Sequence, residues 1–132
     1  MEKKILSTAA IFGMIAIVLG AFGAHALKKV LSLEQLSTFE TGVKYQMYHA
    51  LFLLFLGTSE IISTKVKKII LSLIIIGVLL FSGSIYLLAT NDLTSFNFKV
   101  IGFVTPIGGG FLIFAWVYLL LFFLKGNKSD KK

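Results

Sequence analysis

Three long apolar stretches restrict this chain more than any other feature of its sequence. Residues 5–27, 69–90 and 100–124 contain no Asp, Glu, Lys or Arg. As helices they would each extend over about 30 Å or more, which is the thickness of the hydrocarbon core of a bilayer. A fourth apolar stretch, 43–62, contains a few polar residues. The pattern predicts an all-α integral membrane protein that forms a four-transmembrane-helix bundle.

Composition agrees with a membrane environment. Of 132 residues, 57% are hydrophobic, which is more than a soluble fold of this size can bury. The net charge of +7 comes from lysines clustered between apolar stretches, and arginine is absent. Lysine clusters beside spans suit the anionic headgroups of a cytoplasmic leaflet better than nucleic acid. We therefore expect residues 1–132 to form a single membrane domain with lipid, and no nucleic acid, as its partner.

The first stretch has an alternative interpretation. Lys3 and Lys4 precede the apolar run, and Ala24-His25-Ala26 has the small-x-small pattern of a signal-peptide cleavage site. The run is longer than the apolar region of a typical signal peptide. We therefore expect residues 5–27 to remain as the first span.

The polar segment between the first two spans is expected to lie on the membrane surface. Ser32 and Gln35 have the spacing of a helix capping box, and apolar residues recur at helical intervals after it. We predict a short amphipathic surface helix over residues 33–42, in which Glu40 is solvated, followed by the second span. Glu40 and Lys44 are four residues apart and are expected to pair.

The distribution of lysines predicts the orientation. With four spans, the N-terminal segment, the middle loop and the basic tail 125–132 lie on one side with nine lysines, against four in the other two loops. The positive-inside rule then places both termini in the cytoplasm. We expect a multi-pass protein of the bacterial cell membrane, the inner or cytoplasmic one.

Small residues and one proline mark possible contacts between helices. Gly20 belongs to a face of small residues that recur every three or four positions from Ala9 to Ala24. Such a face lets another helix approach, either within the chain or in a homo-oligomer. Pro106, followed by glycines 108–110, predicts a kink or local unwinding in the fourth span. This break either fits the bundle or forms a substrate site, as in some transporters.

The two histidines are the candidates for a cofactor site. His25 lies three residues from Lys28, and His49 lies five residues from Lys44, so both imidazoles are predicted at similar depth below the outer headgroups. Each imidazole is expected to bridge helices by hydrogen bonding. Haem or metal ligation by the pair, or proton relay, remains an alternative. Two histidines alone are a weak metal signal, so no metal site and no cofactor is predicted.

Patterns typical of enzymes are missing from the sequence. It has no cysteine, no Walker-type glycine loop and no serine elbow, and its acidic residues fall at span boundaries or in loops. No catalytic residue is predicted, and we expect a non-enzyme. A proton-coupled transporter usually needs a carboxylate within the membrane, which makes small-solute transport an alternative rather than the leading hypothesis.

Two segments carry a family resemblance. Residues 20–27, GAFGAHAL, and 39–51, FETGVKYQMYHAL, resemble the signature of the YwdK/YgdD-like family of small bacterial membrane proteins. The resemblance implies a four-span fold and a bacterial membrane location, and it transfers no catalytic residue. The positions of interest are Gly20, Gly23, His25, Glu40, Gly42, Tyr45, Gln46, His49 and Pro106.

The sequence therefore supports a function without catalysis. We expect a polytopic membrane protein that supports membrane organisation or integrity, or a membrane partner such as a second copy or another membrane protein. A haem- or metal-binding protein that uses His25 and His49, and a small-solute transporter, are the alternatives.

Overall fold

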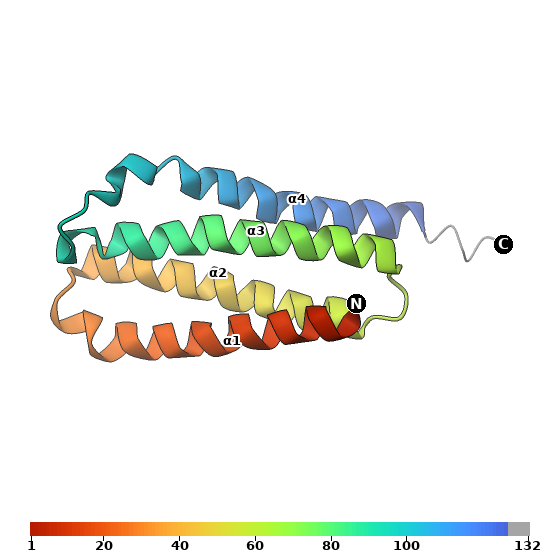
Figure 1. The fold of residues 1–132 in the computed structure, drawn as a ribbon, viewed down its shortest axis with the longest axis horizontal. Coiled ribbons are helices and arrows are strands. Elements are labelled where there is room, and N and C mark those ends of the chain that lie inside the picture. Colours follow the sequence, from red (N-terminus) through yellow and green to blue (C-terminus); the bar gives the residue numbers. More distant parts are fainter. Residues whose placement is uncertain (127–132) are drawn as a thin grey trace.

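The computed structural model describes residues 1–126, which form four long helices lying side by side (Figure 1). The helices are α1 (Glu2–His25), α2 (Leu33–Thr58), α3 (Thr64–Ala89) and α4 (Val104–Lys125). Short 3₁₀ helices lie in the connections: η1 (Leu27–Lys29), η2 (Asn91–Leu93) and η3 (Phe98–Ile101). Of the predicted basic tail, Lys125 ends α4, and residues 127–132 lie outside the described part of the chain.

The helices pack in chain order and run antiparallel. The beginning of α1, the connection between α2 and α3, and the end of α4 lie together at one end of the bundle (Figure 1). The main hydrophobic core joins all four helices, with Ile5, Leu53, Ile70, Ile74 and Leu112 among its buried members. The regular elements of residues 1–126 are all helical, as the sequence predicts.

Glycines set the closest approaches between helices. A Cβ at Gly108 of α4 would overlap the backbone nitrogen of Phe81 in α3. The small face of α1 meets α2 of the same chain. There, a Cβ at Gly20 would lie 3.5 Å from Val43, and one at Gly13 would lie 3.8 Å from the Cβ of Ala50. The small residues thus allow close packing within the chain.

α2 begins earlier than the sequence pattern suggested. The capping box is confirmed: the Gln35 backbone N–H donates to Ser32 Oγ at 3.1 Å, and the Ser32 N–H donates to Gln35 Oε1 at 2.9 Å. However, residues 33–42 are not a separate surface helix, because they continue into the second long helix. Gly42 lies within α2 and packs against α3. The sequence prediction divided α2 near residue 43, where the polarity of the sequence changes.

Three of the four helices are long and apolar enough to cross a membrane. These segments are Glu2–Lys29, Thr64–Ala89 and Phe98–Lys125. α2 does not meet the same hydropathy criterion, because polar residues such as Lys44, Gln46 and His49 fall in its sequence.

The local unwinding predicted at Pro106 is absent. α4 begins at Val104, so Pro106 lies in its first turn, where a backbone N–H has no partner within the helix. Proline is tolerated there without breaking the helix. The glycines that follow stay helical, and Gly108 is the point of closest contact with α3. The predicted span 100–124 therefore does change from η3 and a turn to an α-helix, but it does so before Val104 and not at Pro106 or the glycines.

Candidate functional site

Polar side chains that form hydrogen bonds across the helices form the main candidate site. We define the interhelical polar network as Gln46 and His49 of α2, Ser82 and Tyr86 of α3, and Trp116 of α4. Gln46, His49 and Ser82 are each no more than 4% exposed, whereas Trp116 is 50% exposed. In such surroundings an unpaired polar group is costly, so the partners of each side chain determine what the site can do.

Gln46 joins three helices. Its amide nitrogen donates to the Phe12 carbonyl of α1 at 2.9 Å, and its amide oxygen accepts from the Tyr86 hydroxyl of α3 at 2.7 Å. One turn earlier, the Gly42 carbonyl accepts from the Ser82 hydroxyl at 2.7 Å. Gly42 permits this approach, because a Cβ there would lie 2.7 Å from the Tyr86 ring. This part of the network therefore fixes α2 against both neighbours.

His49 joins α2 to α4. The indole N–H of Trp116 donates to His49 Nε2 at 3.1 Å, and His49 Nδ1 lies 2.7 Å from the Tyr45 carbonyl. Indole nitrogen is only a donor, so Nε2 accepts and Nδ1 carries the proton. The neutral imidazole satisfies both bonds. The Trp116 ring also packs edge-on against Phe52, with centroids 4.2 Å apart.

The hydrogen bonds of the network go to side chains and to backbone carbonyls of the helices. Within residues 1–126, no buried side-chain nitrogen or oxygen lacks a hydrogen-bond partner. Hydrogen bonds between membrane helices typically contribute about 0.6 to 2 kcal/mol each. The arrangement therefore fixes the rotation and register of the helices.

The structure does not bring His25 and His49 together. Gly13 lies opposite Ala50, Gly20 opposite Val43 and Gly23 opposite Phe39, which fixes the antiparallel register of α1 and α2. In that register His25 lies about eleven residues, or roughly 16 Å, from the level of His49.

The prediction of similar depth was therefore wrong. It began the second span near Val43 and counted the depth of His49 from Lys44, whereas α2 begins at Leu33. His25 is exposed at the end of α1, while His49 is buried. Within residues 1–126, no three His, Cys, Asp or Glu side chains are grouped where they could hold a metal ion. A ligand held jointly by the two imidazoles of one chain has no geometric support.

The other predicted positions are either glycines at close helix contacts or exposed residues. Gly23 and Gly42 allow close packing; a Cβ at Gly23 would lie 3.1 Å from the Phe39 ring. Glu40 and Tyr45 are exposed on α2, and Pro106 is exposed on α4. Glu40 forms no ion pair with Lys44 or with any other described residue. The Tyr45 ring packs edge-on against Phe81, with centroids 5.2 Å apart.

The sequence interpretation missed three members of the network. Ser82 and Tyr86 are one helical turn apart in an otherwise apolar span, a pattern that marks a polar face turned toward another helix. Trp116 is the single tryptophan, and it lies well inside its span rather than near an interface. Polar groups at such depth indicate partners, but the sequence does not identify them.

A second polar contact lies at the lysine-rich end of the bundle. Lys65, Lys67 and Lys68 were predicted in a loop, but they belong to the first two turns of α3. Lys67 is only 3% exposed, and its amine donates to Glu2 Oε1 of α1 at 3.1 Å. This ion pair ties the beginning of α1 to the beginning of α3.

Comparison with known proteins reveals related membrane proteins in several bacteria. The family model described as "Protein of unknown function (DUF423)" matches residues 19–109. A UPF0382 membrane protein of Haemophilus influenzae is 38% identical over 119 residues, which cover 90% of this chain and 92% of the relative. YwdK of Bacillus subtilis is 32% identical over 121 residues, covering 90% of this chain and 94% of YwdK.

The UPF0382 inner membrane protein YgdD of Escherichia coli is 36% identical over 126 residues, covering 91% of this chain and 88% of YgdD. No solved structure matches the chain with significant similarity. The segment matched by the family model contains every member of the polar network except Trp116.

Proposed function

This chain belongs to the DUF423 family of UPF0382 membrane proteins, and we propose that it is a non-enzymatic, four-span protein that supports membrane organisation or integrity. The observation that carries the proposal is the contrast between its interior and its surface. The buried polar side-chain atoms of the described residues all have hydrogen-bond partners within the protein, whereas large apolar side chains are exposed on all four helices. Lipid is therefore the proposed principal partner, and no cofactor is required.

The position of α2 supports a fourth span. α2 has 26 residues, as α3 does, and it packs between α1 and α3. Its polar Gln46 and His49 are turned into the bundle and bonded there, so they do not face lipid. Lys44 is exposed, but the flexible lysine side chain can extend along the helix toward the headgroups.

The distribution of lysines supports an orientation. Lys3, Lys4, Lys65, Lys68 and Lys125 lie at the end of the bundle where α1 begins and α4 ends. The opposite end has Lys28, Lys29 and Lys99. We propose that the first end faces the cytoplasm, with both termini on that side of the bacterial cytoplasmic membrane.

Cysteine labelling tests this topology, because the chain has no cysteine of its own. Ser59→Cys introduces a thiol between α2 and α3, and Ser95→Cys introduces one between α3 and α4. A membrane-impermeant maleimide should label Ser95→Cys in intact cells and Ser59→Cys only after permeabilisation. Labelling of both sites in intact cells would contradict the proposal.

Loss of the protein tests the proposed role. Deletion of the gene in its own bacterium should raise uptake of a membrane-impermeant dye under envelope stress, and a plasmid copy should reverse the increase. The purified wild-type protein, reconstituted in liposomes, should neither transport ions nor turn over a substrate. A flux abolished by His49→Ala in correctly folded protein would contradict a purely organisational role and favour transport.

A further inference from the structure

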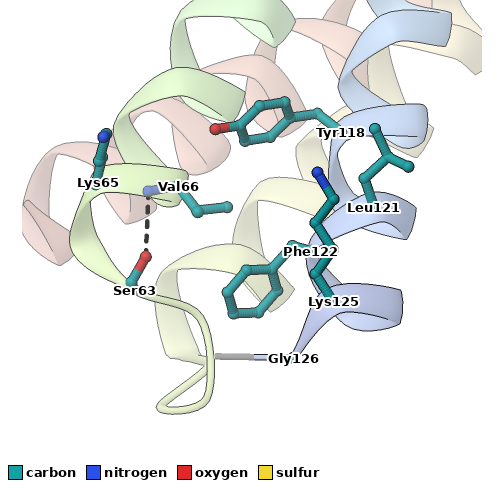
Figure 2. A pocket seen from close by; sticks show the side chains of 8 residues that line it. All are labelled: Ser63, Lys65, Val66, Tyr118, Leu121, Phe122, Lys125 and Gly126. Atoms are coloured by element: carbon teal, nitrogen blue, oxygen red, sulfur yellow. Dashed lines mark hydrogen bonds between the residues drawn. The ribbon is translucent and has the colours of Figure 1, made fainter. Parts of the chain in front are cut away.

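A groove opens between α3 and α4 at the lysine-rich end of the bundle. It has a volume of about 410 Å³, and Lys65, Val66, Tyr118, Leu121, Phe122 and Lys125 are among the residues that line it (Figure 2). Figure 2 shows Tyr118 and Phe122 projecting from α4 toward the first turns of α3, with Lys65 and Lys125 on opposite flanks. The groove is separate from the polar network and contains none of its members.

We propose that this groove binds one anionic phospholipid, with its phosphate between Lys65 and Lys125 and the upper part of an acyl chain against Phe122 and Leu121. The proposal commits to a lipid of the surrounding leaflet, such as phosphatidylglycerol. Basic pockets between membrane helices on the cytoplasmic side are typical sites for anionic headgroups.

The charges of the groove favour an anion. The amine of Lys67 is bonded to Glu2, but within residues 1–126 neither Lys65 nor Lys125 forms an ion pair, and both are exposed. Lys65 also lies in the first turn of α3, where the helix dipole is positive and opposes a lysine. A phosphate placed between the two amines would offset this repulsion.

The apolar lining favours a lipid over a soluble anion. Phe122, Val66 and Tyr118 are half-buried and form an apolar surface between the two lysines. An inorganic phosphate has no apolar part to contact that surface, whereas the acyl chain of a lipid can pack against it. The Tyr118 hydroxyl points toward α3 and offers a donor at the edge of the groove (Figure 2). Charge and apolar surface together match an amphipathic anion.

The groove lies where such a lipid is available. It is at the end of the bundle that holds the beginning of α1 and the connection between α2 and α3 (Figure 1). The proposal rests on the topology proposed above, in which this end meets the anionic cytoplasmic leaflet.

Native mass spectrometry of the purified full-length protein in detergent tests the site. The protein is offered equal amounts of dioleoyl-phosphatidylglycerol and dioleoyl-phosphatidylcholine, and the first bound lipid is identified. The wild type should prefer phosphatidylglycerol. Lys65→Gln/Lys125→Gln should weaken that binding about 30-fold, which corresponds to about 2 kcal/mol for two lysines at a membrane surface.

Two controls identify the source of the preference. Lys28→Gln/Lys29→Gln removes the same charge from the opposite end, and it should keep the wild-type preference. Excess inorganic phosphate should not displace the lipid. Equal loss in both double variants, or displacement by phosphate, would overturn the proposal in favour of general charge attraction or a soluble-anion site.

A further variant tests whether the groove binds lipid without the C-terminal residues 127–132. A protein that ends at Gly126 should still bind one phosphatidylglycerol, and loss of binding would mean that the tail forms the site. Failure of the lipid-binding experiments is distinct from failure of the proposed function. The lipid preference can be absent while deletion still raises dye uptake, and it can be present in a protein whose deletion has no effect.

Discussion

The middle of the bundle and its lysine-rich end use polar residues in opposite ways. In the middle, Gln46 and His49 are buried and bonded to groups on the neighbouring helices. At the end, Lys67 is the only lysine of the described residues with a carboxylate partner, and Lys65 and Lys125 lie beside an open groove. Polar residues within a span can thus have all their hydrogen bonds within the fold and leave none for a ligand. A ligand is more reasonably sought where charged groups remain accessible.

Gly108→Ala should disrupt the middle most severely. The new Cβ would overlap the Phe81 backbone, which cannot move aside as a flexible side chain can, so α3 and α4 must separate. We expect a loss of about 3 kcal/mol in the free energy of unfolding, measured by denaturant titration in micelles.

Gly110→Ala is the matched control, because nothing lies within 4 Å of its Cβ position. That variant should be unchanged or up to about 1 kcal/mol more stable, since alanine favours a helix. Equal stability of the two variants would show that the helices do not approach this closely.

Breaking the bonds of Gln46 should have the next largest effect. Gln46→Leu leaves the Tyr86 hydroxyl without its acceptor and should cost about 1 to 2 kcal/mol. In a double-mutant cycle with Tyr86→Phe, the second substitution should cost less in the presence of the first. Strict additivity would indicate that the two side chains do not interact.

The two histidines should differ in their effect on stability. His49→Leu removes the acceptor of the Trp116 N–H and should cost about 1 kcal/mol, whereas His25→Leu should cost little because His25 is exposed. Trp116 is the single tryptophan, so its emission should respond to His49→Leu and not to His25→Leu. Similar responses to both substitutions would contradict the register that separates the two histidines.

The ion pair at the lysine-rich end should give the smallest change. Glu2 is exposed, and glutamine keeps an oxygen that can accept from the buried Lys67 amine, so Glu2→Gln should lower the melting temperature less than His49→Leu does. Added salt should reduce the effect of Glu2→Gln. Glu2→Gln/Lys67→Met should recover the loss, because the buried charge is removed with its partner. A large effect that is independent of salt would contradict this account of the pair.

The apolar stretches were sufficient to predict three of the helices, because long uncharged runs have few alternatives in a membrane protein. The start of α2 was also encoded, by the capping box at Ser32, but the change in polarity near Val43 concealed the continuity of the helix. The error in histidine depth followed directly from that division. Similarly, Pro106 suggested a kink only because the start of α4 was placed too early.

The partners within the polar network depend on information that a single sequence does not provide. Whether Trp116 faces His49 is determined by the rotation and register of α4, which follow from contacts such as that of Gly108 with Phe81. The groove likewise depends on Lys65 and Lys125 being brought together by antiparallel packing of α3 and α4. The sequence shows these residues but not their pairing.

The most direct test compares two double variants in the deletion strain. Dye uptake under envelope stress is measured with Gln46→Leu/Tyr86→Phe and with Lys65→Gln/Lys125→Gln, each normalised to the amount of folded protein in the membrane. We predict that the first variant protects as well as the wild type per folded molecule, and that the second is abundant but fails to protect. If folded Gln46→Leu/Tyr86→Phe fails to protect while Lys65→Gln/Lys125→Gln protects fully, the claim that the groove and not the polar network is needed for protection would be contradicted.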